Sequence, residues 1–103
     1  MIYFDAGATT LEKPAAVGRA MARAAHTMSS PGRGSYPASR LAGETAYLCR
    51  QEAAELLAVP QPENVVITGS ATHGLNLAIR SLLGPGDRRA ISAYEHNAVT
   101  RPL

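Results

Sequence analysis

The chain has 103 residues, of which 46% are hydrophobic and 17% are charged, and this composition is typical of one small globular domain rather than of a disordered chain. The formal net charge is only +2, and the arginines are scattered except for Arg88 and Arg89. This pattern argues against a nucleic-acid partner, because such surfaces need a dense basic stripe. The sequence starts without a signal peptide, has no segment as long as a membrane span, and contains a single cysteine. We therefore expect a cytoplasmic protein with no membrane partner and no intrachain disulfide.

The first part of the chain is expected to be an extended arm followed by a helix. Residues 1–4 are apolar and predict a short strand or an extended arm. Residues 5–10 are small, so the backbone there either approaches a ligand closely or simply turns into the helix. The helix is predicted to begin near Pro14 and to end before residues 29–32. Its predicted core face consists of Val17, Met21, Ala24 and Met28.

A loop with two glycines around Arg33 separates this helix from a second one. Arg33 either presents its guanidinium to an anion or is an ordinary surface residue, and the sequence leaves both interpretations open. The second helix is predicted over residues 39–58, after which two prolines prevent it from continuing. Cys49 lies on its apolar face, so we expect a small buried thiol rather than a reactive one. The predicted face consists of Ala42, Ala46, Cys49, Ala53 and Leu56.

The most informative stretch reads as a strand, a tight turn and a helix. The β-branched residues 65–68 predict a buried strand, a Gly-Ser pair interrupts it, and the apolar spacing over residues 71–83 predicts a helix. This arrangement directs several backbone amides and the positive end of the helix dipole to one place, where a phosphate binds well. Residues 89–93 predict a second strand, so the whole segment is expected to form one right-handed βαβ unit with parallel strands.

His96 follows the second predicted strand closely. Ligands of parallel α/β sheets bind beyond the carboxyl ends of the strands, so we expect His96 and the phosphate turn to face one crevice. The imidazole either stacks on a flat ligand or transfers protons there, or it merely begins a helix and bonds to local backbone. The sequence contains no P-loop, no dinucleotide fingerprint and no metal-ligand spacing, and we expect no metal site.

Four segments, taken in order, resemble class V aminotransferases, most closely the cysteine desulfurase-like branch. Residues 2–10 are similar to the family opening Y-x-D-N-A-A-T-T, and residues 31–34 are similar to its P-G-R-G loop. Residues 68–76 resemble T-S-G-A-T-E-A-L-N, and residues 95–103 resemble E-H-N-S-V-x-R-P-L. Because the four occur in family order over nearly the whole chain, together they are a more specific signal than any one alone.

The resemblance implies pyridoxal 5'-phosphate (PLP) as cofactor and the α/β fold of a fold-type I PLP enzyme. It divides the chain into residues 1–38, which are an arm, a helix and a loop, and residues 39–103, which begin the large cofactor-binding domain with its first βαβ unit. The implied cofactor ligands are Ser70, Ala71 and Thr72 for the phosphate and His96 for the pyridine ring. The implied substrate side consists of Ala6, Gly7, Ala8 and Arg33. The implied substrate is an amino acid, with cysteine favoured, and the full-length enzyme is expected to be a homodimer.

The sequence departs from the family pattern at positions that matter for the chemistry. Ala6 replaces the usual Asn, and Gly69 and Ser70 stand in reversed order. The family's Schiff-base lysine has no counterpart, because Lys13, the only lysine, lies in no matching motif. We therefore expect the front part of a longer PLP-dependent transferase, with no catalytic residue of its own and no activity alone. The alternative is a non-catalytic remnant that binds a phosphate or a partner chain.

Overall fold

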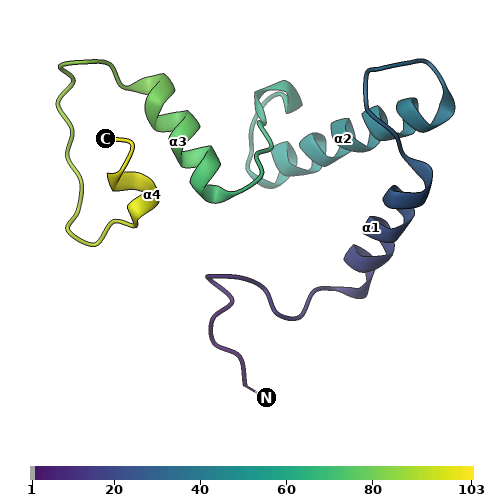
Figure 1. The fold of residues 1–103 in the computed structure, drawn as a ribbon, viewed down its shortest axis with the longest axis horizontal. Coiled ribbons are helices and arrows are strands. Elements are labelled where there is room, and N and C mark those ends of the chain that lie inside the picture. Colours follow the sequence, from purple (N-terminus) through teal and green to yellow (C-terminus); the bar gives the residue numbers. More distant parts are fainter. Residues whose placement is uncertain (1) are drawn as a thin grey trace.

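The computed structural model describes residues 2–103 as a series of helices joined by extended segments (Figure 1). Met1, the first residue of the predicted arm, lies outside the described residues. The rest of that arm, residues 2–4, is not a strand. In chain order the elements are α1 (Ala15–Thr27), α2 (Pro37–Leu56), the short 3-10 helix η1 (Pro62–Asn64), α3 (Ala71–Leu82) and α4 (Asn97–Thr100).

The three long helices lie where the sequence predicts them, with small shifts at their ends. Pro14 is the N-cap of α1, as expected for a residue that fixes its own φ and offers no amide. The second helix begins at Pro37 rather than at residue 39, with the proline in its first turn. It ends at Leu56, and the chain then turns sharply through Ala58, whose φ is 52°.

The two predicted strands are absent, so the βαβ unit is not confirmed. Residues 65–68 and 89–93 are not strands, and no backbone hydrogen bond joins them in the part of the chain that the structure describes. A β-branched run becomes a strand only when a neighbouring strand accepts and donates its backbone hydrogen bonds. Of the predicted α/β fold, residues 2–103 show the helices and none of the strands.

Little of the chain is buried. The buried residues in the described part are Ser39, Ala42, Ala54 and Ala98. The predictions that Met21 and Cys49 are buried are wrong, since Met21 is 68% exposed and the Cys49 thiol is also exposed. The main contacts between elements join α2 to η1 and α3 to α4, and the apolar faces of α1 and of the middle of α2 therefore face solvent.

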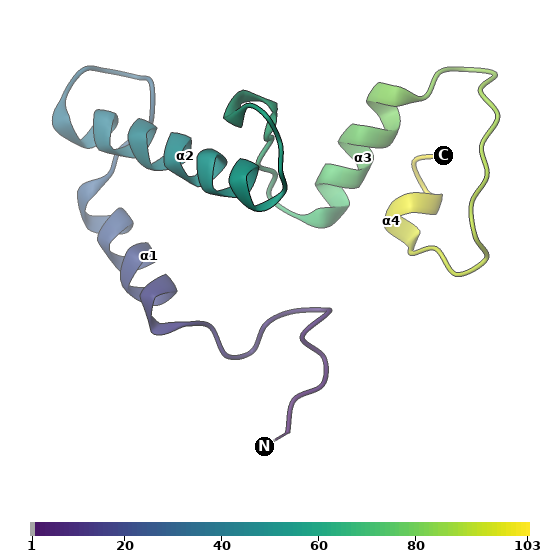
Figure 2. The same ribbon diagram turned by 180° about the vertical axis from the view of Figure 1, so that it is seen from behind.

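The overall shape is open. The radius of gyration is 17.9 Å, whereas a compact domain of this length has about 13 Å. Figures 1 and 2 show the same spread from opposite sides, with α1 and α4 on opposite sides of the molecule. Within residues 2–103, none of the helices combines the length and the hydrophobicity needed to cross a bilayer.

Residues 83–96 connect α3 to α4 and reverse the direction of the chain, so that α4 packs beside α3. The turn in this segment is closed by the Gly84 amide, which donates to the Asp87 carboxylate at 2.6 Å, and Gly86 takes a φ of +90°. The Arg89 guanidinium then donates to the carbonyls of Gly84 and Leu103. Arg89 thus links Gly84, which follows α3, to Leu103, which follows α4. The helices α3 and α4 lie against each other (Figure 2).

Candidate functional site

The first turn of α3 is capped by Ser70. Its Oγ accepts a hydrogen bond from the His73 amide at 3.1 Å, and its carbonyl accepts from the Gly74 amide at 3.0 Å. This cap occupies the third amide of the helix. The amides of Ala71 and Thr72, the first two of the helix, make no hydrogen bond within residues 2–103. Two free amides at the positive end of a helix of this length favour an anion.

His96 caps α4 with its side chain. The imidazole Nδ1 accepts a hydrogen bond from the Ala98 amide at 3.0 Å, and the His96 carbonyl accepts from the Val99 amide at 2.8 Å. The structure thus shows the local backbone bond that sequence reasoning kept as an alternative. Because Nδ1 is the acceptor, the neutral ring carries its proton on Nε2, which can donate to a ligand.

Thr72 and His96 line one cavity of about 300 Å³ between α3 and α4. Asn76 lies one turn beyond Thr72, and its Nδ2 donates to the Thr72 carbonyl at 2.9 Å. Of the predicted phosphate turn only Thr72 lines this cavity with His96, whereas Ser70 and Ala71 do not, and helix packing rather than a sheet brings Thr72 and His96 together. The residues around the cavity are Thr72, Asn76, His96, Asn97, Ala98 and Arg101.

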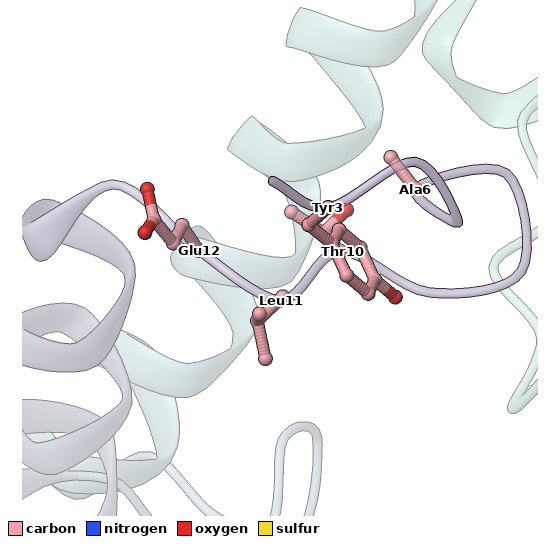
Figure 3. Close-up of a pocket in the computed structure, with 5 residues that line it drawn as sticks. All are labelled: Tyr3, Ala6, Thr10, Leu11 and Glu12. Atoms are coloured by element: carbon pink, nitrogen blue, oxygen red, sulfur yellow. The ribbon is translucent and has the colours of Figure 1, made fainter. Parts of the chain in front are cut away.

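The predicted substrate-side residues Ala6, Gly7 and Ala8 form a turn elsewhere. The Asp5 carbonyl closes it by accepting from the Ala8 amide at 3.1 Å, and the Tyr3 hydroxyl donates to the Thr9 carbonyl at 2.7 Å. Ala6 lines a separate cavity of about 270 Å³ with Tyr3, Thr10, Leu11 and Glu12 (Figure 3). This cavity shares no residue with the one that Thr72 and His96 line.

Arg33 lies exposed in the loop between α1 and α2. The Ser39 hydroxyl donates to the Ser30 carbonyl at 2.9 Å, and the hydroxyls of Ser29 and Tyr36 are 2.7 Å apart, so the two ends of the loop are held together. Gly32 has a φ of +73°, which a residue with a side chain adopts only at a cost. The structure therefore fixes the loop but brings Arg33 to neither cavity.

Sequence reasoning missed Asn76 and Arg101 as residues of the cavity. A signal was available for Asn76, because residues four apart lie on the same helix face and Thr72 was already a candidate. Arg101 belongs to the last family-like segment, but nothing in its spacing showed that α4 would pack on α3. Lys13 does not line the cavity, and its Nζ donates to the Thr10 carbonyl at 2.6 Å. Residues 2–103 contain no group of three or more His, Cys, Asp or Glu side chains that could hold a metal ion.

Comparison with known proteins decides the family. A family model described as Aminotransferase class-V matches residues 2–103. The chain belongs to the class-V aminotransferase family. Membership implies the fold of fold-type I PLP enzymes, and it confirms the resemblance that the four sequence segments indicate.

Curated relatives of this class-V chain are cysteine desulfurases that are several times longer. The chain is 32% identical over 104 residues to a probable cysteine desulfurase of Vibrio cholerae and 30% identical over 102 residues to a cysteine desulfurase of Klebsiella pneumoniae. Each alignment covers 95% of this chain and 25% of the relative. A probable cysteine desulfurase of Mycolicibacterium paratuberculosis is 28% identical over 102 residues, covering 95% of this chain and 15% of the relative. No solved structure matches the chain.

Proposed function

We propose that this chain supplies the phosphate-binding and ring-binding part of the cofactor site in a PLP-dependent cysteine desulfurase. The observation that carries the proposal is the common cavity of Thr72 and His96. Ser70, Ala71 and Thr72 would hold the phosphate, and His96 would lie against the pyridine ring. Cysteine as the amino-acid substrate is supported by the cysteine desulfurases among the relatives.

The residues around the cavity fit a small aromatic phosphate. Its volume of about 300 Å³ lies at the lower end of the range for small-molecule sites, about 300–1,000 Å³. Thr72 lines the cavity and offers a hydroxyl and a free amide, which are donors suited to phosphate oxygens, and the free amide of Ala71 precedes it just outside the cavity lining. When bound, PLP supplies an electron sink for the α-carbon of an amino acid.

The chain's own residues have separable tasks in this proposal. Ser70 accepts the hydrogen bond of the third amide of α3, which belongs to His73. The first two amides, of Ala71 and Thr72, remain available to the phosphate. His96 is held by the Ala98 amide, which fixes the ring and leaves Nε2–H as the donor. A ring held before the ligand arrives loses less freedom on binding, and this preorganisation strengthens the affinity.

The substrate-side residues are proposed to complete the site only in an assembled enzyme. Ala6, Gly7 and Ala8 lie in the turn beside the cavity of Figure 3, and Arg33 lies in the exposed loop before α2. We place them on the substrate side of a homodimer, in the cytoplasm, with residues 1–38 as arm, helix and loop and residues 39–103 as the start of the large domain. By itself the 103-residue chain is proposed to be inactive, because its only lysine is Lys13.

The test is PLP binding by the complete gene product that contains these residues, with and without the substitution His96→Ala. We expect the variant to bind PLP more weakly and to show an altered cofactor absorbance spectrum. His26→Ala is the matched control, since His26 is an exposed residue in the last turn of α1. Unchanged affinity and an unchanged spectrum in His96→Ala would count heavily against the proposal.

A second candidate is a non-catalytic module that binds a phosphate or a partner chain. The exposure of large apolar side chains such as Ile67 (55%) and Ile91 (53%) favours it, because an unpaired apolar segment is a surface for another chain. This candidate requires that the 103 residues fold cooperatively by themselves. A broad melting curve of the isolated chain would exclude it.

A further inference from the structure

Arg101 lines the cavity, and the function proposed above assigns it no role. Arg101 follows α4 directly, continues its helical backbone with φ −70° and ψ −37°, and lines the cavity together with Thr72 and His96. It is the one lining residue whose charge is permanent, and no carboxylate lines the cavity. The cavity is therefore biased towards an anionic ligand.

The Arg101 guanidinium is not engaged inside the protein. Arg89, by contrast, uses its guanidinium to hold the carbonyls of Gly84 and Leu103. Arg101 is exposed, and none of the side-chain hydrogen bonds within residues 2–103, such as those of Arg89 and His96, involves its guanidinium. Glu95, the acidic residue nearest in sequence, accepts from the Ser92 hydroxyl at 2.9 Å and does not line the cavity.

The residues that line the cavity from α3 indicate which ligand the Arg101 guanidinium would bind. Thr72 belongs to the first turn of α3, where the amides of Ala71 and Thr72 are free. Asn76, also on that wall, already donates its amide to the Thr72 carbonyl. A tetrahedral oxyanion on the Thr72 side leaves oxygens that face away from α3, and a planar guanidinium binds two such oxygens at once.

We propose that Arg101 is a phosphate-binding residue of this cavity, contacting the phosphate ester of the cofactor from α4 while α3 contacts it from the other side. The inference rests on the proposed function, since it requires that PLP binds between α3 and α4. It adds to that function a charged ligand from the second helix, and it makes the phosphate the group that joins the two helices.

The test compares PLP with pyridoxal, which lacks the phosphate, by calorimetric titration of the complete gene product. The variants are Arg101→Gln, which removes the charge, and Arg101→Lys, which keeps it. Arg80→Gln is the control, because Arg80 is an arginine in the last turn of α3 that does not line the cavity of Thr72 and His96. Circular dichroism of each variant checks that the helices form.

We expect Arg101→Gln to weaken PLP binding roughly 10- to 100-fold, the usual effect of a hydrogen bond to a charged group, and to leave pyridoxal binding unchanged. Arg101→Lys should recover part of the affinity, and Arg80→Gln should match the unchanged protein. Equal loss of both ligands in Arg101→Gln would mean a structural role and would overturn the inference, as would an unchanged affinity for PLP. If the unchanged protein binds no PLP, the proposed function itself fails and takes this inference with it.

Discussion

His96 and Ala98 are joined by a hydrogen bond of 3.0 Å from the Ala98 amide to the imidazole Nδ1. The same imidazole lines the cavity that Thr72 lines from α3. One side chain therefore caps α4 and also forms a wall of the candidate cofactor site. The two tasks use different parts of the ring, since the cap needs only an acceptor at the Nδ1 position and ring contact needs the aromatic face.

The two tasks of His96 separate in the substitution His96→Asn. Asn is a good N-cap and keeps an acceptor, whereas Ala does not, so we expect His96→Ala to lower the free energy of unfolding by about 1 kcal/mol more than His96→Asn. Both variants lack the ring and should bind PLP equally weakly. Thermal unfolding and PLP titration of the complete gene product measure the two effects. Full PLP affinity in His96→Asn would show that only the cap matters.

Ser70 offers a similar separation at the start of α3. Ser70→Ala removes the acceptor of the His73 amide and should destabilise the protein by about 1 kcal/mol. Ser70→Asp keeps a cap and should preserve helix stability, but its charge repels a phosphate at the neighbouring amides. We therefore expect Ser70→Asp to abolish PLP binding while unfolding remains near normal. Undiminished PLP affinity in Ser70→Asp would contradict a phosphate at this turn.

The loop that carries Arg33 depends on the closeness of Gly34 to Tyr36. A Cβ atom at Gly34 would lie 2.6 Å from Tyr36 Cε1 and 2.8 Å from Cδ1, too close for the ring to stay in place. Gly34→Ala should therefore displace Tyr36, break its hydroxyl contact with Ser29, and cost roughly 1–3 kcal/mol of stability. Gly43→Ala is the control, because nothing lies within 4 Å of a Cβ there and helix propensity should make that change stabilising. Equal stability of the two variants in thermal unfolding would refute the steric argument.

The open shape leads to a prediction about the 103-residue chain by itself. Its buried apolar residues in the described part are the alanines Ala42, Ala54 and Ala98, whereas side chains such as Met21 remain exposed. Burial of three methyl groups cannot offset the backbone entropy of the helices. We expect a broad, non-cooperative melt by circular dichroism and strong binding of the dye ANS. A sharp melt would favour the non-catalytic module over the cofactor-site proposal.

Local signals in the sequence were sufficient for the helices but not for the strands. Pro14 and the apolar spacing along each helix predicted α1, α2 and α3 close to where they lie, although α2 begins at Pro37 rather than at residue 39. A strand depends on a partner elsewhere in the chain or beyond it. The runs at residues 65–68 and 89–93 have the composition of strands, yet within residues 2–103 they remain unpaired.

Burial was also predicted from periodicity; it is confirmed for Ala42 and wrong for Met21 and Cys49, for the same reason. An apolar stripe shows which face of a helix would be buried, but Cys49 and Met21 become core only if something packs against them. For the site, the family-like segments predicted Thr72 and His96 as cofactor residues; both line one cavity, and their role stays a prediction. Arg101 could not be found in this way, because its place in the cavity depends on how α4 packs against α3.

The central claim is that one PLP molecule contacts Thr72 through its phosphate and His96 through its ring. The most direct measurement titrates the complete gene product and its Thr72→Val and His96→Ala variants with both PLP and pyridoxal. The account predicts that Thr72→Val weakens PLP binding roughly 10-fold or more and leaves pyridoxal binding unchanged, since only a hydrogen bond to the phosphate is lost. It predicts that His96→Ala weakens the binding of both ligands. If both variants bind PLP as tightly as the unchanged protein, the cavity between α3 and α4 is not the cofactor site.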